Sequence, residues 1–582
     1  MKRLSITILT LLPVATFSFA ATPELRIQHR RPSASVLLDN GRTLCVANRH
    51  SGTLSLVDIT QRNVVEKQIG QQLSDVAVLP GSDRLIVTDF AGGSAIVVKH
   101  SSGQLSIEDR IEVSAWPESI AVSELGDLVC VASLWSRRVT ILAHKQTDDG
   151  QRPAITKLQQ VDLPFAPRAI QFVDPLRVVV ADSFGGRLVV LDCAVGKIAA
   201  THELPVHNIR NMALGKDRRL YLTCQRLNSK GYTTSDDIHW GILMENEVLA
   251  ISVESLLNTT GEQSLKTERI ALGGPGVGAG DPEAVLVTAD QLLVTLAGTD
   301  ELALIDRVGV REARLPTGGR PVSMTRDVPS NRVFVVNSLT DSVTVIDLST
   351  NQQVDSISLG PSPAAGPVER GERAFFSAKL SLENWMSCQS CHTDGHTNNG
   401  LADTLGDDDF GDAKRVPTLR GVWSTGPWAW NGSQHQLHSQ IRKSLDDTMH
   451  HSSIDDTLVT DLTAYVSQLE RVPSVIVARG EAMHPTVDYQ AREVFEAAGC
   501  SVCHNSFTSY TTDGTFDVGL RDSHGNSQFN PPSLSGVSQR DRLFHDGRAS
   551  SIEDVLTRFE HPAKDSLTAS DRQTIIDFLK GL

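Results

Sequence analysis

The sequence is short of cysteine, of positive charge and of long apolar runs. Only 8 of its 582 residues are cysteine, so chance would rarely bring several of them into one short pattern. The formal net charge is −15 and the isoelectric point is about 5.6, which argues against a nucleic-acid partner. Beyond the N-terminus no stretch approaches the roughly 20 apolar residues that cross a bilayer, and no membrane span is predicted.

The N-terminus has the pattern of a secretory signal peptide, predicted to comprise residues 1–20. Met1 is followed by two basic residues, then by an apolar run from Leu4 to Phe17 and by small residues that end at Ala20. The apolar run is too short to span a bilayer comfortably. We therefore expect a periplasmic protein that is cleaved after Ala20.

One pattern repeats roughly every 40–50 residues between residues 30 and 360. Each unit has two strands of alternating apolar character separated by a polar turn, as in residues 44–48 and 53–58. Such alternation is typical of half-buried antiparallel strands. About seven units predict an all-β, seven-bladed propeller over residues 21–362, because a single four-stranded blade cannot bury both of its faces. A long array of Ig-like β domains is the alternative.

Several polar residues of the repeat region have two interpretations. The fifth unit carries an insertion from Arg226 to Asn246, long enough to reach a neighbouring domain or a partner. Arginines near strand ends could line the axial channel or be solvated loop charges; they are Arg49, Arg137, Arg168 and Arg210. Scattered histidines are expected to be ordinary surface or loop residues: His50, His100, His202, His207 and His239. Cysteines in or beside the strands are expected to be buried thiols: Cys45, Cys130, Cys193 and Cys224.

The Pro/Gly/Ala-rich segment 359–368 ends the strand periodicity, and the chain beyond it is helical and duplicated. The halves are predicted to comprise residues 363–472 and 473–582. Each has a leading helix (369–387 in the first half), a C-x-x-C-H motif, a P-[TS]-L-x-G-V segment and a closing amphipathic helix. This is the minimal plan of a cytochrome c domain. The predicted fold class is therefore a multidomain protein, an all-β propeller followed by an all-α tandem of cytochrome c domains.

The two C-x-x-C-H motifs are the attachment signature of c-type haem. Two thiols three residues apart can form thioethers to one porphyrin, and the adjacent imidazole then binds its iron. The predicted attachment residues are Cys388, Cys391, Cys500 and Cys503, and the predicted proximal ligands are His392 and His504. A thioredoxin-like pair would need a βαβ context, and a zinc site would not need a histidine directly after each second cysteine. Two covalent haems are therefore predicted.

The order of segments over about residues 368–582 resembles the bacterial di-haem cytochrome c peroxidase and MauG superfamily. The likeness is strongest in KRVPTLRGVWSTGPWAWNGS, residues 414–433. The strand pair from Asn337 to Asp347 likewise resembles the YVTN family of bacterial seven-bladed propellers. The first resemblance implies that one haem meets peroxide and that the other receives or relays electrons.

Two residues are candidates for the sixth iron ligands. Met449 lies 57 residues after His392, and His561 lies 57 residues after His504, each ahead of its closing helix. Equal offsets in duplicated halves favour distal positions for both. A methionine ligand raises the haem potential relative to two histidines, so Met449 would suit a high-potential electron store. Core packing of Met449, with His450 or the next histidine as ligand, is the alternative; His561 could instead be a distal acid or base.

Peroxide cleavage needs an open iron position and a group that moves a proton between the two oxygens. In the family a glutamate just after W-D-G-R-x-x-x-L commonly serves. That position falls at His438 or Ser439 in the first half, neither of which is a carboxylate, and at Glu553 or Asp554 in the second. The resemblance therefore implies either a peroxide site at the second haem, assisted by Glu553 or Asp554, or weak or absent peroxidase activity.

Two further groups after the first motif have alternative interpretations. Trp423, Trp428 and Trp430 could relay electrons or pack in the core. The acidic run 407–409 could help to hold calcium, as in relatives, or be a solvated loop.

The resemblance implies a periplasmic di-haem oxidoreductase that reduces hydrogen peroxide with electrons from a donor protein, with the propeller as a docking module. Oxidation of a partner protein or an organic molecule, as in MauG, is one alternative. A non-enzymatic electron-transfer cytochrome is the other.

Overall fold

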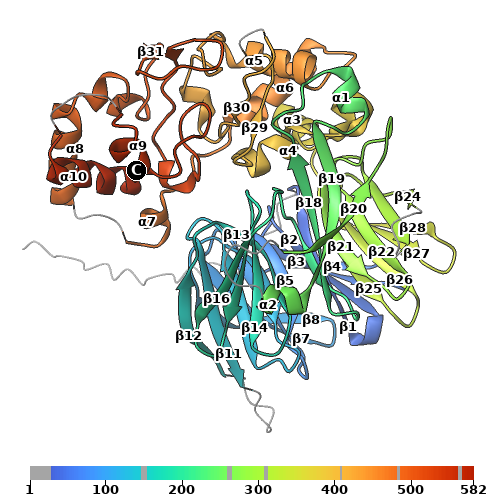
Figure 1. The fold of residues 1–582 in the computed structure, drawn as a ribbon. Coiled ribbons are helices and arrows are strands. Elements are labelled where there is room, and N and C mark those ends of the chain that lie inside the picture. The colour runs from blue at the N-terminus through green and yellow to red at the C-terminus, as the bar shows by residue number, and fades with distance from the viewer. Residues whose placement is uncertain are drawn as a thin grey trace, which may run out of the picture.

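The computed structural model describes residues 28–145, 154–258, 265–306, 312–406, 409–481, 485–561 and 567–582. The predicted signal peptide lies outside them. Figure 1 shows a ring of β-strands with a helical part lying over one side of it. Among the described residues, no helix is both long and apolar enough to cross a membrane.

The ring consists of seven antiparallel sheets of four consecutive strands, here called blades 1 to 7 in chain order. Blades 1 to 3 contain β1 (Pro32–Leu38), β2 (Thr43–Asn48), β3 (Thr53–Asp58), β4 (Val64–Gln68), β5 (Leu73–Val78), β6 (Arg84–Asp89), β7 (Ser94–Ser101), β8 (Gln104–Glu112), β9 (Pro117–Val122), β10 (Leu128–Ser133), β11 (Arg138–Lys145) and β12 (Ala154–Asp162). Blades 4 and 5 contain β13 (Pro167–Phe172), β14 (Arg177–Asp182), β15 (Arg187–Asp192), β16 (Lys197–Glu203), β17 (Met212–Leu214), β18 (Arg219–Leu227), β19 (Met244–Ser252) and β20 (Thr267–Leu272). Blades 6 and 7 contain β21 (Pro282–Val287), β22 (Gln291–Leu296), β23 (Glu301–Asp306), β24 (Glu312–Pro316), β25 (Pro321–Asp327), β26 (Arg332–Asn337), β27 (Ser342–Asp347) and β28 (Gln352–Ser358).

The first strands of neighbouring blades lie against one another around the ring, and β25 of blade 7 returns to β1 of blade 1. The ring is therefore closed. This confirms the predicted seven-bladed propeller and excludes a linear array of β domains.

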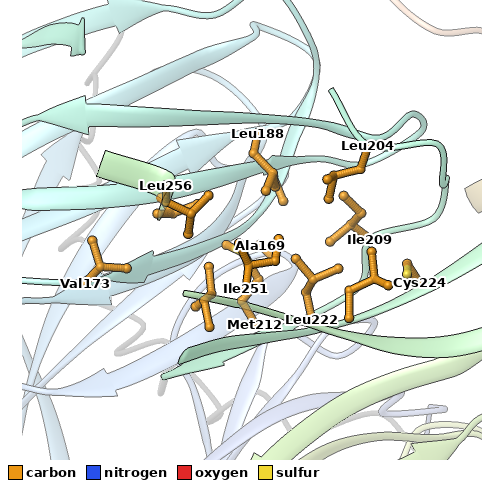
Figure 2. Packing of buried hydrophobic residues seen from close by; sticks show 14 of the residues in the cluster. Ala169, Val173, Leu188, Leu204, Ile209, Met212, Leu222, Cys224, Ile251 and Leu256 are labelled. Atoms are coloured by element: carbon orange, nitrogen blue, oxygen red, sulfur yellow. The ribbon is translucent and has the colours of Figure 1, made fainter. Parts of the chain in front are cut away.

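The core of the ring lies between neighbouring blades. Figure 2 shows one such layer, in which Leu188 and Leu204 pack against Leu222 and Ile251 of the next blade. Strands β6 and β10 are buried along their whole length, although their alternating pattern predicts one exposed face. The difference arises because a second strand has a neighbouring blade against both of its faces.

The four cysteines outside the C-x-x-C-H motifs are buried in the blades and form no disulfide, as expected. The Sγ atoms of Cys130 and Cys193 lie 3.5 Å apart. Burial raises the pKa of the Cys45 thiol to about 12. This thiol is therefore protonated at neutral pH and behaves as a small apolar side chain.

Asp341 of blade 7 joins both ends of the propeller. Its carboxylate accepts hydrogen bonds from the backbone N–H groups of Arg30 (3.1 Å) and Arg31 (2.9 Å), just before β1. It also accepts one from the Ser362 hydroxyl, 2.6 Å away in the linker that follows β28. One carboxylate thus ties the beginning of the ring, its end and the chain leading to the helices.

The helices after the ring form two parts, here called the first helical unit (residues 363–472) and the second helical unit (473–582); these boundaries stay predictions. The first contains α3 (Pro367–Phe375), α4 (Cys388–Cys391), β29 (Leu401–Ala402), β30 (Lys414–Arg415), α5 (Leu437–Lys443) and α6 (Asp456–Ser467). The second contains α7 (Val475–Ala478), α8 (Pro485–Ala497), β31 (Phe516–Asp517), β32 (Gln528–Phe529), α9 (Ile552–Thr557) and α10 (Ala569–Gly581). Each has its own apolar core, around Phe375 and Leu462 in the first and around Phe495 and Phe578 in the second.

The helix predicted over residues 369–387 is wrong in its second half, because α3 ends at Phe375. The chain then runs through short turns in which Glu383 (φ 55°) and Asn384 (φ 66°) have left-handed backbone. The carbonyl groups of these two residues accept hydrogen bonds from the N–H groups of Gly278 (2.7 Å) and Gly280 (3.0 Å) of the propeller. Contact with the propeller thus replaces helix in front of the first C-x-x-C-H motif.

The insertion of blade 5 reaches the first helical unit, as one interpretation predicted. It contains α1 (Ser235–His239), while α2 (Val253–Asn258) follows β19. His239 Nδ1 lies 2.9 Å from a carboxylate oxygen of Glu383. The carbonyl of Thr233 accepts a hydrogen bond from His450 Nε2 at 2.8 Å.

Candidate haem sites

The first C-x-x-C-H motif lines a cavity of about 320 Å³, whose walls come mainly from the first helical unit and partly from residues 529–533 and Arg540 of the second. Cys388 and Cys391 begin and end α4, and His392 follows directly. Met449 is buried, lines the same cavity and follows one wide helical turn after α5. The structure therefore brings together two thiols, an imidazole and a thioether. Whether Met449 binds iron stays a prediction, but His450, named in the alternative, is held by the propeller instead.

The proximal histidines share one hydrogen-bonding arrangement. His392 Nδ1 donates to the carbonyl of Pro417 at 2.9 Å, and His504 Nδ1 donates to the carbonyl of Tyr510 at 2.9 Å. A carbonyl only accepts, so each ring carries its proton on Nδ1 and leaves Nε2 as the nitrogen able to bind iron. Burial lowers the pKa of both rings to about 4, which keeps them neutral and able to bind a metal.

Two buried arginines at the first cavity lack a counter-charge. Arg415 and Arg540 both line it, and neither forms an ion pair with a carboxylate within the described part of the chain. Burial, followed by repulsion from Arg540, lowers the pKa of Arg415 to about 9, and burial lowers that of Arg540 to about 10. The Nε of Arg540 is buried without a hydrogen-bond partner. Burying an unpaired charge costs several kcal/mol, on the order of the loss of a buried ion pair.

The residues of this cavity fit a c-type haem. The thiols of Cys388 and Cys391 would take the vinyl groups and His392 the iron. Arg415 and Arg540 would pair with propionate carboxylates, which supply the negative charge that the apolar walls lack. The uncompensated arginines are evidence for such a group that is independent of the C-x-x-C-H spacing.

The second motif lies in the core of the second helical unit. Cys500 is buried there beside Phe544, and the ring of His561 lies 5.6 Å from the ring of Phe544. The Nδ1 atom of His561 is buried without a hydrogen-bond partner, and burial lowers the pKa of this ring. Charge on His561 also lowers the pKa of His504, so the two imidazoles share one neighbourhood. The role of His561 as a ligand or as an acid–base group stays a prediction.

The carboxylates predicted to assist peroxide cleavage are engaged elsewhere. Glu553 forms an ion pair with Lys580 of α10. Burial raises the pKa of Glu553, but the hydrogen bond and charge of Lys580 together with hydrogen bonds from its own backbone N–H and from Ser551 outweigh burial, and the net pKa is lowered. Asp554 accepts a hydrogen bond from the N–H of Ser550 at 3.0 Å. A catalytic role for either stays a prediction, and for Glu553 it requires release from Lys580.

The three tryptophans after the first motif differ in position. Trp428 and Trp430 line the first cavity, whereas Trp423 is 61% exposed. Trp430 Nε1 donates to the carbonyl of Arg415 at 2.9 Å, and the Trp430 ring lies 6.4 Å from that of His545 in the second helical unit. Two of the three aromatic rings thus face the candidate haem, which suits either packing or relay.

The calcium prediction falls partly outside the described residues, which omit Asp407 and Asp408. Asp409 is exposed, and one of its carboxylate oxygens lies 3.9 Å from His524 Nδ1. Within the described ranges no group of three or more His, Cys, Asp or Glu side chains could hold a metal ion. Calcium remains a prediction.

The propeller contacts the first haem-binding segment directly, which sequence reasoning missed. The Asp281 carboxylate accepts hydrogen bonds from the hydroxyls of Ser387 and Ser390 (2.6 Å for Ser390), at the start of α4. His207 Nε2 donates to the carbonyl of Ser390 at 3.0 Å, and burial lowers the pKa of His207 to about 4. His207 is therefore a buried contact residue, and its interpretation as an ordinary loop histidine is wrong.

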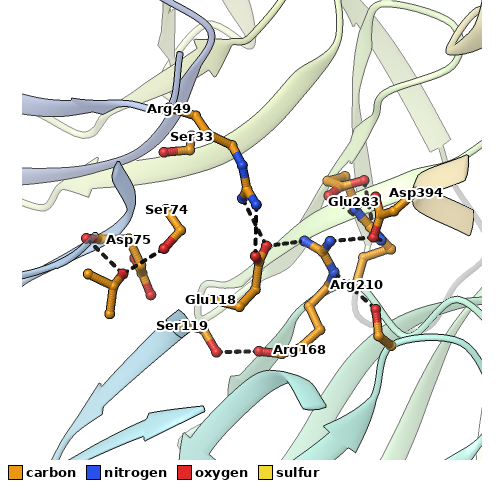
Figure 3. Close-up of polar contacts among 12 residues, drawn as sticks. Ser33, Arg49, Ser74, Asp75, Glu118, Ser119, Arg168, Arg210, Glu283 and Asp394 are labelled. Atoms are coloured by element: carbon orange, nitrogen blue, oxygen red, sulfur yellow. Dashed lines mark hydrogen bonds and ion pairs between the residues drawn. The ribbon is translucent and has the colours of Figure 1, made fainter. Parts of the chain in front are cut away.

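A chain of alternating charges lies where the propeller meets the first helical unit (Figure 3). Arg49 pairs with Glu118 at 3.0 Å, and Arg168 pairs with both Glu118 at 2.8 Å and Asp394. Arg210 continues the chain, 3.1 Å from Asp394 and 2.9 Å from Glu283. Burial raises the pKa of Asp394, but the arginines outweigh it and hold that pKa well below its usual value.

This charge chain shows that three of the four arginines are not solvated loop charges. Arg49, Arg168 and Arg210 line a cavity between the propeller and the first helical unit, and the last two pair with Asp394, two residues after His392. Arg137 instead bonds to Gln539 and Asp541 of the second helical unit, with Nε 2.9 Å from Gln539 Oε1.

Four residues that precede a proline have left-handed backbone where a blade meets the helical units. They are Arg31 (φ 50°), Trp116 (φ 58°), Asp281 (φ 56°) and Arg320 (φ 54°). Bulky side chains rarely adopt this conformation, which costs on the order of 1–3 kcal/mol per residue. Each contacts a helical unit: Arg31 pairs with Glu372, Trp116 packs in the cluster of Val472, Asp281 binds Ser390, and Arg320 stacks on Phe376. The four strained positions thus lie at the contacts between the propeller and the helical units.

Comparison with known protein families gives a match within the helical part of the chain. Residues 366–491 match the family model described as di-haem cytochrome c peroxidase. No curated protein sequence matches the chain significantly.

Solved structures with similar folds share little sequence with the chain. Hydrazine synthase of Kuenenia stuttgartiensis has 18% identity and a TM-score of 0.48, covering 58% of this chain and 99% of that one. Virginiamycin B lyase of Staphylococcus aureus has 12% identity and a TM-score of 0.40, covering 54% and 94%. The dihydro-haem d1 dehydrogenase NirN has 16% identity and a TM-score of 0.38, covering 58% and 67%. The chain thus joins a seven-bladed β-propeller to a helical region that carries, at residues 366–491, a domain of the di-haem cytochrome c peroxidase family.

Proposed function

We propose that the protein is a periplasmic di-haem oxidoreductase that reduces hydrogen peroxide with electrons from a donor protein. The observation that carries this proposal is the first cavity, where Cys388, Cys391 and His392 face two buried arginines without a counter-charge. The family match at residues 366–491 supports a haem peroxidase-type oxidoreductase. Haem iron, when bound, supplies the redox chemistry, and the chain supplies the ligands, the charges and the proton transfer.

The second helical unit is where we place the peroxide reaction. Glu553 would take up a proton there and return it to the departing oxygen. Its lowered pKa keeps it ionised and ready to accept that proton. Because Lys580 holds Glu553 in the described conformation, the reaction requires that ion pair to open. His561, with its unpartnered buried Nδ1, is the second group able to move a proton at this site.

Electrons would enter at the exposed edge of the second motif. Val502, between the two cysteines, is 67% exposed, and Phe507 just after His504 is 96% exposed. Tyr489 of α8 is 64% exposed, and acidic residues follow it on the same helix at Glu493 and Glu496. An apolar patch with an acidic surround suits brief contact with a basic redox protein. Docking on the propeller itself also stays part of the proposal.

A peroxide titration of the purified two-haem protein tests the proposal. Rapid-mixing absorbance should show one haem responding to a stoichiometric amount of peroxide, and the Glu553→Gln variant should respond about 100-fold more slowly. Glu560→Gln, an exposed carboxylate just beyond α9, is the matched control and should respond like wild type. Absence of a spectral response at either haem would remove the peroxidase proposal.

A non-enzymatic electron-transfer cytochrome is the second candidate, and two observations favour it. Met449 lies in the first cavity, and His561 lies near His504, so each site offers one residue that would serve as a sixth ligand if haem were bound. This function predicts two low-spin, six-coordinate haems at every potential. An EPR spectrum before and after one-electron reduction decides between the two: a high-spin signal in either state rules out the cytochrome function.

A further inference from the structure

The two C-x-x-C-H motifs differ at the positions that the propeller contacts. In the first motif a serine stands directly before each cysteine, namely Ser387 and Ser390. The corresponding residues of the second motif are Gly499 and Val502. Neither of these two has a side chain that donates a hydrogen bond, and Val502 is 67% exposed. The duplicated halves therefore differ in two hydroxyl groups at the segment where haem would be attached.

Both serine hydroxyls bind one carboxylate of blade 6. Ser387 and Ser390 donate to different oxygens of Asp281, at 2.6 Å for Ser390. The Ser390 hydroxyl also accepts a hydrogen bond from the N–H of Ser387 at 2.9 Å, so its own proton is left for Asp281. Both oxygens of Asp281 thus accept hydrogen bonds, as those of an ionised carboxylate do.

Asp281 is buried, and the blade around it fixes its position. Its backbone is left-handed (φ 56°), and its carbonyl accepts a hydrogen bond from the N–H of Ala297 at 2.8 Å. A Cβ on Gly298 would lie 3.1 Å from Asp281 Oδ2, so the absence of a side chain there makes room for the carboxylate. A left-handed aspartate persists only where its surroundings determine it, and here those surroundings belong to the propeller.

A second propeller residue holds the same short helix. His207 Nε2 donates to the carbonyl of Ser390 at 3.0 Å. A helix as short as α4 leaves carbonyl groups without a partner inside the helix, and His207 supplies one. Burial lowers the pKa of His207 to about 4, so this contact adds a hydrogen bond but no charge at neutral pH.

The charge of Asp281 acts on the attachment segment. Burial, followed by the charge of Asp281, raises the pKa of the Cys388 thiol to about 12. Burial raises the pKa of Asp281 itself, and the hydrogen bonds from the two serines oppose that effect. Arg210 lowers the pKa of Asp281 less than those hydroxyls do. The negative charge is therefore stabilised mainly by the two hydroxyls of the first motif rather than by a cation.

We propose that Asp281 is a positioning residue for the first haem, which fixes α4 through Ser387 and Ser390 and lowers the midpoint potential of the haem attached there. A fixed negative charge beside the attachment segment favours the oxidised state, which carries one more positive charge. Because the second motif lacks both hydroxyls, Asp281 acts on one haem and not on the other. The proposal rests on the haem attachment of the proposed function, and not on the reaction with peroxide.

A redox titration of the purified two-haem protein, followed by absorbance, tests the proposal. Asp281→Asn removes the charge and keeps the shape, and asparagine tolerates left-handed backbone. At a fixed potential the variant should raise the ratio of reduced to oxidised first haem about tenfold, which corresponds to about 59 mV for one electron. The potential of the second haem should stay unchanged. Full-length variants that lack one pair of attachment cysteines assign each potential to its haem.

The matched control is Asp300→Asn in the same blade. Asp300 also has left-handed backbone (φ 60°) and also bonds to the first helical unit, at 2.6 Å from Lys379. Its partner lies outside the C-x-x-C-H motif, and this ion pair is partly exposed. The control should therefore change the ratio at either haem less than about twofold. Thermal melting and haem content check that both variants fold.

Hydrogen exchange of the wild-type protein gives a second measurement that depends on no variant. The backbone amides of residues 387–392 should exchange at least about tenfold more slowly than those of residues 499–504, because the propeller holds only the first segment. The proposal is overturned by an unchanged first-haem potential in the well-folded Asp281→Asn variant, by equal shifts at both haems, by an equal shift in Asp300→Asn, or by equal exchange of the two segments. Wild-type protein without haem at the first motif would instead contradict the proposed function.

Discussion

The two helical units share one plan, yet the propeller treats them differently. Around the first, blades 5 and 6 contact α4 through His207 and Asp281, and the charge chain holds Asp394. Around the second, the ion pairs involve residues outside its C-x-x-C-H motif: Asp541 pairs with Arg137 and Arg187, Arg479 with Asp162, and Glu481 with Arg138. Val502 within the second motif and Phe507 just after it meanwhile expose apolar side chains. The propeller therefore encloses one haem-binding segment and leaves the edge of the other open.

Removing either pair of attachment thiols is the strongest test of this comparison. We expect Cys388→Ser with Cys391→Ser, and Cys500→Ser with Cys503→Ser, each to lower the covalent haem content from two equivalents per chain to about one. The pyridine haemochrome assay measures this content. Cys193→Ser, at a buried thiol of the propeller, should leave two equivalents. Retention of two haems in either double variant would contradict the predicted sites.

The ion pairs between the propeller and the first helical unit should contribute more to the free energy of unfolding than those with the second. Asp394→Asn removes a buried carboxylate shared by Arg168 and Arg210 and should lower the free energy of unfolding by about 3–5 kcal/mol. Asp541→Asn, the matching change at the second unit, should lower it by about 1 kcal/mol, because that carboxylate is more exposed. Denaturant titration of both variants measures the difference. Equal losses would show that the propeller holds both units alike.

Two buried carboxyl groups of the propeller, one inside the charge chain and one outside it, allow a test by pH. Glu118, in the charge chain beneath the first unit, has its pKa raised by burial but lowered more by Arg49 and Arg168. Asp75, one blade away, is not lowered by any such cation, and burial raises its pKa to about 7. At Asp75 the folded state therefore keeps a proton that the unfolded state releases between about pH 4 and pH 7, and the contribution of Asp75 to stability falls as pH rises through that window.

The variant that isolates this effect is Asp75→Asn. Its unfolding free energy should lack the part of the decline due to Asp75, about 1–3 kcal/mol between pH 4 and pH 7. Thermal melts across this range, compared with wild type, give the measurement. Parallel curves for the two proteins would mean that Asp75 ionises normally.

The smallest expected effect compares one exposed aromatic residue at each unit. Phe507→Ser should raise the KM for a reduced basic cytochrome c about three- to tenfold without changing the direct reaction with peroxide. Trp423→Ser, 61% exposed at the first unit, should leave that KM unchanged. Steady-state oxidation of the donor by peroxide measures both. A larger effect at Trp423 would move electron entry to the first unit.

Much of the fold could be predicted from the sequence because its signals are local. Alternating strands and turns predict the blades, and C-x-x-C-H predicts the attachment segments without any knowledge of tertiary contacts. The equal offsets of Met449 and His561 also proved informative, since Met449 lines the same cavity as the first motif. The structure also explains the P-T-L-R-G-V segment, because the carbonyl of its proline accepts the hydrogen bond that orients His392.

The remainder depends on contacts between residues far apart in the chain. His207 and Asp281 are 183 and 109 residues from Ser390, and no spacing rule connects them. The leading helix is shortened because Gly278 and Gly280 bind its backbone, which local helix propensity does not register. The unpaired charges of Arg415 and Arg540 become visible only when the structure shows that neither forms an ion pair with a carboxylate among the described residues.

The carboxylate of Asp341 makes the order of assembly matter. It binds the backbone of Arg30 and Arg31, and Arg31 in turn reaches Glu372 in α3. These contacts therefore join the start of the ring, its last blade and helix α3 at one place. A chain without its first blade would lack the Arg30 and Arg31 partners of Asp341 and Glu372. We therefore expect truncation at the N-terminus to impair maturation of a haem centre that lies more than 300 residues downstream.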